Sequence, residues 1–546
     1  MGPVQEIDLW SPFTSDILLE VRTSMMKKMP GLEVESGIDK TPREGPVRVS
    51  SLGLEADEHD PTFHGGHDKA VHGYCSSHYP GWVEEYPAAA DRFKPGAFGE
   101  NFVTKYMNER NVCIGDVIAV GDEVVLQVSL PRQPCYKLNH RFQLKNFAPT
   151  TFKTSRTGWY YRVLKEGTVK AGDEIRLVER KWPKWTIERI QEYLHRNQND
   201  LAMNEELAAI DELGKESRGA FQRRVAKAKA LEKREKGDKW RDFKIIEKSA
   251  QTPRIASFVV EAVSLDENAE GLQPGAHAKL KLPNGLLRSY SIVSGNRNKF
   301  ELGVALESQS RGGSRYLHES TAVGDVLQVG RITTDVQVAS ASSNHVFIVG
   351  GIGITAFLAL AEAYLKVHYS FEMHYAVRSA DDVPFRPRLE ALGCSVRLYD
   401  GSTGERMDIG HIMRTLKWNS HVYVCGPTRM IEAARKAAEE CGLDESDVHY
   451  EAFSADTSGD PFEVDVVNRE GKVLKVGGEE TLLKVLKREV GEGIESSCEV
   501  GNCGTCKVVL KSGRVDHRGT ALTPEDKVGS MLSCVSRGIG RISIEV

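Results

Sequence analysis

The sequence predicts a multidomain protein: a β-rich barrel with a small helical appendage, then a second β-barrel, an α/β domain and an α+β domain. Its 546 residues exceed the ~100–200 residues of a typical single domain. A proline-free segment with helical periodicity separates two strand-rich segments. Strand and helix patterns then alternate over residues 345–453, which is typical of a parallel sheet.

The first 182 residues contain many short β-branched runs that are separated by turns with Gly-Asp pairs. Gly supplies the positive φ of a tight turn, and Asp bonds to its own backbone there. Many short strands of this kind are typical of a barrel or a sandwich. Strands are expected at residues 117–120, 123–128 and 174–178.

A helical segment is predicted for residues 186–235. It contains no proline, and Ile187, Ile190 and Leu194 recur at helical spacing. Thr186 is a suitable N-cap for its first helix. The Lys-, Arg-, Ala- and Glu-rich stretch at residues 223–236 is interpreted as a solvated helix that leads into a linker, not as a binding surface.

Composition excludes several classes of protein. A formal net charge of −5 argues against a generally basic nucleic-acid binder. The most apolar stretch, residues 346–361, is too short and too rich in Gly to span a membrane. Acidic residues near the N-terminus argue against a signal peptide, so we expect a cytoplasmic protein. Ten cysteines are too few for a disulfide scaffold, and the oligomeric state stays open.

Four cysteines near the C-terminus follow the spacing C-x4-C-x2-C, with 27 residues between the third and the fourth. This is the spacing of a plant-type [2Fe–2S] cluster, whereas zinc sites prefer two paired C-x2-C units and only one is present. The expected ligands are Cys498, Cys503, Cys506 and Cys534.

The residues around these cysteines resemble the ferredoxin domain of the phthalate dioxygenase reductase family. The resemblance rests on the run from Ser497 to Lys507 and on Asp516-His517-Arg518. It implies a β-grasp domain. The sequence predicts strands at residues 462–468, 507–510 and 541–546, and a helix at residues 482–489.

A flavin site is expected in the second strand-rich segment, residues 241–338. Arg288 can pair with a flavin phosphate, Tyr290 can pack on the ring and Ser291 can reach its polar edge. About twenty residues later, the backbone amides of Gly312 and Gly313 and the Ser314 hydroxyl could hold a phosphate.

These two motifs together resemble the flavoprotein reductases. The run from Ser310 to Tyr316 resembles the phthalate dioxygenase reductase branch, which implies FMN rather than FAD.

A Gly-rich turn follows the predicted strand at residues 346–349 and precedes an apolar helix. Such a turn suits a pyrophosphate because it presents backbone amides at a helix start. A second strand ends at Cys425-Gly426-Pro427. The residues of the first turn are Gly350, Gly351, Gly353 and Thr355.

Both turns resemble the nicotinamide domain of the ferredoxin-reductase family, in which the cysteine lies near the nicotinamide. Arg378 follows a strand at residues 374–377, where the adenosine ribose is expected. The relatives use NADH, which we favour. An Arg at this position could also meet the 2′-phosphate of NADPH.

Three motifs in the first 185 residues resemble the MOSC domain, and most closely the bacterial 6-hydroxylaminopurine reductases. They are the run from His64 to His72, the run from Gly96 to Phe102 and the run from Leu130 to Arg141. The resemblance implies a β-rich fold, a molybdenum–pyranopterin cofactor and reduction of N-hydroxylated compounds. These relatives also carry a three-helix appendage, which fits residues 186–235.

Cys135 is the candidate catalytic residue and molybdenum ligand. A thiolate suits molybdenum, and the cationic neighbours Arg132, Lys137 and Arg141 could pair with an anionic cofactor. Cys75 and Cys113 lack such neighbours and are interpreted as small buried residues. The family motif also marks cofactor contacts at His64, Asp68 and Lys69.

Five histidines between residues 59 and 78 could suggest a zinc site. They lack the spacing of known zinc motifs, and a Gly-Gly turn interrupts them, so structural or cofactor-contact roles are favoured. These residues are His59, His64, His67, His72 and His78.

The predicted domains form a chain of electron carriers. They are a MOSC domain (1–185), a helical appendage with linker (186–239), a flavin barrel (240–340), an NAD domain (341–455) and a ferredoxin domain (460–546). The order predicts electron flow from NADH through FMN and [2Fe–2S] to molybdenum. The favoured function is reduction of a small N-hydroxylated substrate, R–NH–OH, to an amine and water, in detoxification. The alternative is an electron donor for a separate Rieske-type oxygenase, with the MOSC part as a docking or sulfur-carrier module.

Overall fold

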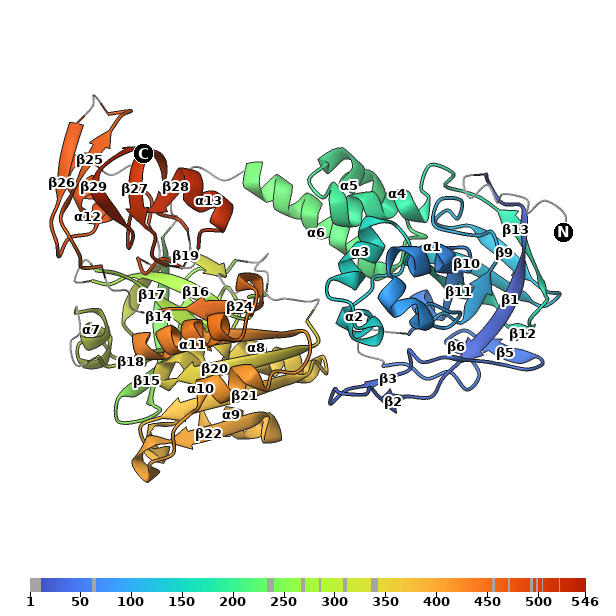
Figure 1. Ribbon diagram of the computed structural model, residues 1–546, viewed down its shortest axis with the longest axis horizontal. Coiled ribbons are helices and arrows are strands. Elements are labelled where there is room, and N and C mark those ends of the chain that lie inside the picture. Colours follow the sequence, from blue (N-terminus) through green and yellow to red (C-terminus); the bar gives the residue numbers. More distant parts are fainter. Residues whose placement is uncertain are drawn as a thin grey trace. The chain divides into compact units, whose positions relative to one another are not determined.

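The computed structural model divides into two compact units, residues 1–236 with 340–343 and residues 237–339 with 344–546, and each is described by itself (Figure 1). The structure describes residues 11–60, 65–232, 240–266, 271–283, 286–307, 312–334, 342–453, 457–469, 472–491, 494–496, 499–502, 504–519 and 521–546.

The N-terminal unit is built on a β-barrel in the strand order β13-β9-β10-β11-β7-β8-β1, closed by pairing between β13 and β1, with β4 added beside β1. The pairings are antiparallel except that β7 and β8 run parallel. Its strands are β1 (Ser15–Thr23), β4 (Thr41–Pro42), β7 (Val71–Cys75), β8 (Phe102–Thr104), β9 (Val117–Val120), β10 (Val124–Pro131), β11 (Trp159–Lys165) and β13 (Glu174–Glu179). The unit also has two small sheets. One pairs β2 (Lys27–Lys28) with β3 (Glu35–Ser36), and the other has the order β12 (Gly167–Val169), β5 (Val47–Ser50) and β6 (Gly53–Leu54).

An aromatic cluster packs three short helices beside the barrel. The helices are α1 (His78–Glu85), α2 (Tyr136–Phe142) and α3 (Phe147–Lys153). Trp82 of α1 and Phe142 of α2 are fully buried in this cluster, together with Phe98 of the intervening loop. Aromatic rings bury large apolar areas, so the cluster fixes α2 firmly. Cys135 is the N-cap of α2 and is therefore held in place by this packing.

The helical segment after the barrel divides into α4 (Ile187–Gln191), a π-helical turn (Glu192–Arg196), α5 (Leu201–Ala208) and α6 (Lys215–Glu232). The Thr186 side chain accepts a hydrogen bond from the Arg189 amide, as the N-cap prediction requires. Asp200 caps α5 in the same way. Leu207 and Phe221 are fully buried against the barrel core, so the appendage and the barrel share one core.

The C-terminal unit begins with a six-stranded closed barrel in the order β14-β15-β18-β17-β16-β19. Its inward residues form one apolar core that includes Phe258 and Leu280. The elements are β14 (Arg241–Ala250), β15 (Ile255–Ala262), β16 (Ala276–Lys281), β17 (Leu287–Gly295), β18 (Lys299–Ala305), α7 (Gly313–Glu319) and β19 (Val326–Thr334).

A parallel five-stranded sheet follows, in the order β22-β21-β20-β23-β24. Successive residues of its central strand face opposite layers, because side chains alternate along a strand. Phe347 and Val349 pack with α8 and α9, whereas Val346 and Ile348 pack with α10 and α11. The elements are β20 (Asn344–Gly350), α8 (Ile354–Lys366), β21 (Phe371–Val377), α9 (Arg386–Ala391), β22 (Val396–Asp400), α10 (Ile409–Arg414), β23 (Ser420–Cys425), α11 (Thr428–Glu440) and β24 (Val448–Glu451).

The last domain has a mixed sheet in the order β26-β25-β29-β27-β28, with β25 and β29 parallel, and α12 packs on it. Helix α12 has its predicted bounds. Strand β27 extends beyond the expected residues 507–510. The prediction ended too early because bulges around Gly513 interrupt the side-chain alternation that marks a strand. The elements are β25 (Phe462–Val466), β26 (Lys472–Val476), α12 (Leu482–Glu489), β27 (Lys507–Asp516), α13 (Pro524–Gly529), β28 (Ser530–Leu532) and β29 (Arg537–Glu545).

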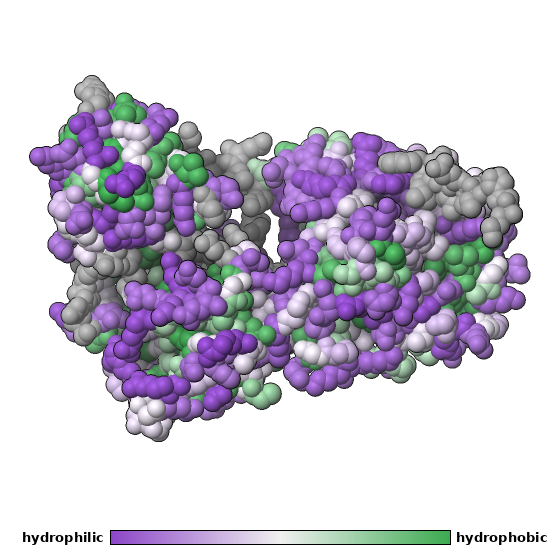
Figure 2. All heavy atoms as spheres, in the orientation of Figure 1, coloured by the Kyte–Doolittle hydropathy of each residue, from purple (hydrophilic) through white to green (hydrophobic). Residues whose placement is uncertain are grey.

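Hydrophilic side chains cover most of the visible face of each unit (Figure 2). Within the described ranges, no helix is both long and apolar enough to cross a membrane.

Candidate redox sites

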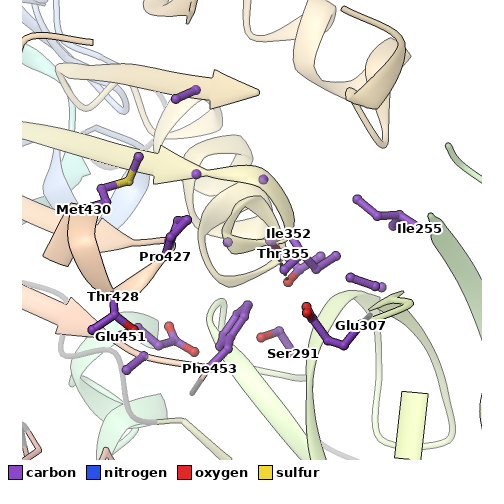
Figure 3. Close-up of a pocket in the computed structure, with 18 of the residues that line it drawn as sticks. Ile255, Ser291, Glu307, Ile352, Thr355, Pro427, Thr428, Met430, Glu451 and Phe453 are labelled. Atoms are coloured by element: carbon purple, nitrogen blue, oxygen red, sulfur yellow. Dashed lines mark hydrogen bonds between the residues drawn. The ribbon is translucent and has the colours of Figure 1, made fainter. Parts of the chain in front are cut away.

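The C-terminal unit contains a cavity of about 1070 Å³ between the barrel and the α/β domain, here called the interdomain cavity. Figure 3 shows Ser291 and Glu307 of the barrel across from Pro427, Glu451 and Phe453 of the α/β domain. The cavity lies at the carboxyl ends of the parallel strands. Ligands of open α/β sheets bind at these ends, where the strand order reverses.

The two predicted turns of the α/β domain fit closely into each other. A Cβ on Gly353 would lie 2.4 Å from the main-chain oxygen of Cys425, and one on Gly350 would lie 2.8 Å from Pro427 Cδ. Both glycines are therefore required for close packing of the turns. Gly350, Gly351, Gly353, Thr355, Gly426 and Pro427 all line the cavity.

Cys425 is fully buried at the end of β23 and is absent from the described lining of the cavity. Burial, followed by the nearby Glu451 carboxylate, raises the pKa of the Cys425 thiol well above its usual value. The thiol is therefore neutral at physiological pH and is not a nucleophile in this state.

The barrel contributes the residues expected at a flavin. Arg288, Tyr290 and Ser291 on β17 line the cavity together with Gly313 and Ser314. A Cβ on Gly313 would lie 2.8 Å from Arg288 Cγ, so the turn before α7 packs on the Arg288 side chain. Burial raises the pKa of Tyr290 to about 12 and keeps its phenol neutral. Gly312 is the N-cap of α7, with a φ of 93°.

Arg378 lines the cavity at the end of β21, as expected for a residue near the adenosine. Arg406 and Arg429 line the same cavity. Asp382 and Glu405 lie among them, so acidic and basic groups are mixed around the predicted ribose position.

Sequence reasoning missed several residues of this cavity, including Arg254, Glu307, Glu451 and Phe453. Glu451 could have been predicted in principle, because it ends a strand that pairs with β23 and stands opposite Cys425. The others come from loops, whose positions no periodicity predicts.

The C-terminal domain brings two of the predicted cluster ligands into one apolar group. Cys506 and Cys534 are both buried, with Leu483, Leu522 and Val535 around them. Cys498 and Cys503 lie outside the described residues.

The loop between these cysteines is closely packed. Gly501 has a φ of 86°, and a Cβ there would lie 2.8 Å from Gly519 Cα. Gly504 also has a positive φ. Two buried thiols beside a glycine-rich loop fit an iron–sulfur cluster, since glycine permits backbone amides to turn toward sulfur.

The N-terminal unit has a smaller cavity of about 80 Å³, here called the Cys135 cavity. Arg132 lines it beside Cys135 and is 7% exposed. Among the described residues, its Nη1 has no hydrogen-bond partner. Because burying an unpaired donor is unfavourable, this guanidinium indicates a site for an anion.

Two lysines of the Cys135 cavity pair with carboxylates of the same cavity. Lys40 forms a buried ion pair with Asp57, and Asp57 Oδ2 accepts a bond of 2.8 Å from Asn101 Nδ2. Lys137 Nζ lies 3.8 Å from Asp60 Oδ2. Burial lowers the pKa of Lys40, and the Asp57 carboxylate opposes that shift.

The remaining family-motif residues divide between the cavity and the barrel wall. Lys69 lines the Cys135 cavity and forms an ion pair with Glu216. Asp68 instead accepts from Arg162 Nε over 3.0 Å and from the Lys215 amide over 3.0 Å, so its carboxylate joins the barrel to α6. His64 lies outside the described residues.

Arg141, the third predicted cationic neighbour of Cys135, pairs with Asp39 at 2.9 Å and is not among the described lining residues. His59 and His72 line the cavity, whereas His78 is buried in a 2.7 Å contact with Glu109. His67 contacts the main-chain oxygen of Ser51.

Cys75 and Cys113 are buried, as their sequence surroundings suggest. Burial raises the pKa of each thiol to about 12, so neither resembles a reactive cysteine.

Three family models match parts of the chain. A MOSC domain matches residues 60–176, a YiiM-like 3-alpha helix domain matches residues 185–228, and a 2Fe-2S iron-sulfur cluster binding domain matches residues 465–537.

Fold and sequence together define a class: a multidomain oxidoreductase in which a MOSC domain with its helical appendage precedes a reductase-type flavin, NAD and [2Fe–2S] electron-transfer module. The chain belongs to the family of a protein named reductase from Gibberella moniliformis, which is 37% identical over 97% of this chain and 95% of that protein.

Two further relatives match only part of this chain. The heme-dependent oxidative N-demethylase beta subunit of Ectopseudomonas mendocina is 33% identical over 53% of this chain and 93% of its own length. The carnitine monooxygenase reductase subunit of Escherichia coli is 32% identical over 49% of this chain and 86% of its own. Among solved structures, phthalate dioxygenase reductase matches with 28% identity and a TM-score of 0.43, over 56% of this chain and 98% of that one.

Proposed function

We propose that the chain is a self-sufficient NADH-dependent reductase of N-hydroxylated compounds. In this proposal, electrons from NADH reach the MOSC domain through FMN and a [2Fe–2S] cluster of the same chain. The observation that carries the proposal is Arg132, whose buried Nη1 has no hydrogen-bond partner in the described part of the chain and lies in one cavity with Cys135. Fusing the donor to this site raises its effective concentration there.

The residues of the Cys135 cavity suit a molybdenum cofactor. Cys135 offers a soft thiolate ligand, and Arg132 offers a cation for an anionic group. The bound metal would supply an acceptor for the hydroxyl oxygen of the substrate. Lys40 and Lys137 are held by Asp57 and Asp60, so the wall of the cavity is fixed before any ligand enters.

The interdomain cavity suits a flavin and NADH. Arg288 would hold the flavin phosphate, and Tyr290 would pack on the ring. The glycine turns at residues 350–353 would leave room for the pyrophosphate of NADH. A flavin exchanges electrons in one- and two-electron steps. It can therefore accept two electrons as hydride from NADH and pass them one at a time to the cluster.

A second function deserves a test because two relatives that align with about half of this chain are named as reductase subunits of monooxygenases. In this alternative, the C-terminal unit reduces a separate Rieske-type oxygenase. The MOSC part then serves as a docking or sulfur-carrier module.

Metal analysis combined with a substrate panel separates the two functions. We expect purified protein to hold molybdenum and iron and to oxidise NADH when a hydroxylamine, an amidoxime or a hydroxylaminopurine is added, with formation of the amine. Iron without molybdenum, and no amine formed from any of these compounds, would support the oxygenase-donor function instead.

Replacing Arg288 by alanine should weaken flavin binding. Loss of a charge-assisted hydrogen bond costs about 1.5–3 kcal/mol, which corresponds to about a ten- to hundredfold loss of affinity. The flavin content after gel filtration measures the effect. Arg297→Ala, in a turn of the same barrel away from the cavity lining, is the control. Full flavin retention by Arg288→Ala would show that this guanidinium does not hold the phosphate.

A further inference from the structure

A buried lysine connects the flavin barrel to the cluster loop, defined here as residues 494–506. Lys279 lies on β16 and is 6% exposed. Its Nζ donates a hydrogen bond of 2.7 Å to the main-chain oxygen of Ser496. Ser496 stands two residues before Cys498, the first predicted cluster ligand. The bond therefore joins two domains of the C-terminal unit at the start of the ligand loop.

The buried position of this ammonium needs an explanation. Lysines on a barrel surface normally extend their charge into water, and burial is unfavourable unless the group is hydrogen-bonded. Lys279 Nζ lies 5.8 Å from the centre of the Trp240 ring and reaches a carbonyl of the cluster loop. The Ser496 carbonyl thus replaces one of the hydrogen bonds to water that the buried charge has lost.

The bonded loop also belongs to the interdomain cavity. Lys279 stands opposite Ser289 in the pairing of β16 with β17, and Ser289 lines the cavity. Glu499, Val500 and Asn502 of the cluster loop line the same cavity. The lysine therefore joins the strand that precedes the predicted flavin residues to the loop that holds predicted cluster ligands.

Two further contacts hold the loop. Asn502 Nδ2 donates to the main-chain oxygen of Ala452 over 2.7 Å, which connects the loop to the α/β domain. Lys487 Nζ donates to Ser496 Oγ over 2.6 Å and pairs with Glu499 at 3.1 Å, within the C-terminal domain. The described residues of the cluster loop thus bond to the barrel through Lys279, to the α/β domain through Asn502 and to their own domain through Lys487.

We propose that Lys279 is a positioning residue for electron transfer from flavin to cluster. It holds the cluster loop against the interdomain cavity, and its charge favours the reduced cluster. In each step one electron leaves the reduced flavin, which is oxidised, and one electron enters the cluster, which is reduced. The reduced cluster carries one additional negative charge, so a nearby cation stabilises it. The inference rests on the flavin-to-cluster part of the proposed function and is independent of the MOSC substrate.

The test uses the full chain with flavin and cluster bound, carrying Lys279→Met. After mixing with NADH, flavin bleaching should proceed at the wild-type rate. Reduction of the cluster should slow about ten- to hundredfold. This is the factor by which one charge-assisted hydrogen bond favours the state in which the cluster loop is held against the interdomain cavity. A redox titration followed by electron paramagnetic resonance should give a more negative cluster potential. A purely structural role for the lysine would not shift this potential at full iron content.

Lys281→Met is the matched control. Lys281 is exposed two residues further along β16, and its Nζ lies 5.9 Å from the same Trp240 ring, so the variant removes a charge of the same sign that solvent already screens. It should retain the wild-type transfer rate and potential. If Lys279→Met loses flavin or iron, Lys279→Gln is measured instead and should lower the potential in the same direction.

A transfer rate and a potential in the Lys279 variants that equal those of Lys281→Met would overturn the inference. Failure of the flavin-to-cluster part of the proposed function would look different, because NADH would then not reduce the cluster of the wild-type protein.

Discussion

Cys534→Ser should stop electron flow to every acceptor beyond the flavin while hydride transfer from NADH persists. Cys534 is 1% exposed and packs with Cys506 in the apolar group that surrounds the predicted cluster. Serine is a poor ligand for iron compared with thiolate, so assembly of the cluster should fail or weaken. Iron content should fall, and reduction of an N-hydroxylated substrate should decrease by orders of magnitude.

Stopped-flow absorbance shows on which cofactor the electrons accumulate. Flavin bleaching by NADH should match the wild type, because the predicted flavin residues Arg288, Tyr290 and Ser291 lie in the barrel. Cys441→Ser is the control, since Cys441 is a half-buried cap of α11 away from the cluster. If the reduced flavin of Cys534→Ser is reoxidised by substrate at the wild-type rate without oxygen, the cluster is not on the path.

The fold class was predictable because its local signals agree with the tertiary structure. The Thr186 cap, the turn at Gly350 and the bounds of α12 all follow from capping, glycine and periodicity rules. The bulges around Gly513 hid the true length of β27. A bulge breaks the alternation on which strand prediction depends.

The candidate sites were only partly predictable. Motifs identify Arg288 and Gly353, because each lies beside a recognisable turn or strand end. The role of Asp68 was not predictable from the sequence, because its partners Arg162 and Lys215 lie 94 and 147 residues further along the chain. The same holds for Lys279 and Ser496, which are 217 residues apart. Contacts between distant segments depend on tertiary packing and leave no periodic signal.

Cys135→Ser should abolish reduction of N-hydroxylated compounds while leaving the reductase module intact. The cavity around Cys135 holds Arg132, whose Nη1 finds no hydrogen-bond partner among the residues that the structure describes. Serine would replace the soft ligand by a hydroxyl that is a weaker donor to molybdenum. Molybdenum content should fall with the activity. NADH-dependent reduction of ferricyanide should stay near the wild-type rate, because the predicted flavin and nicotinamide residues belong to the C-terminal unit.

Cys113→Ser is the matched control in the same unit. Cys113 is buried, its thiol pKa is raised to about 12, and its Sγ contacts the Pro183 carbonyl at 3.7 Å, a contact that a hydroxyl can also make. This variant should keep both molybdenum and activity. If Cys135→Ser reduces a hydroxylamine as fast as Cys113→Ser does, the thiol of Cys135 is not the metal ligand. Arg132 would then identify an anion site in the N-terminal unit that serves another purpose, and the oxygenase-donor function would become the better account of the fused reductase.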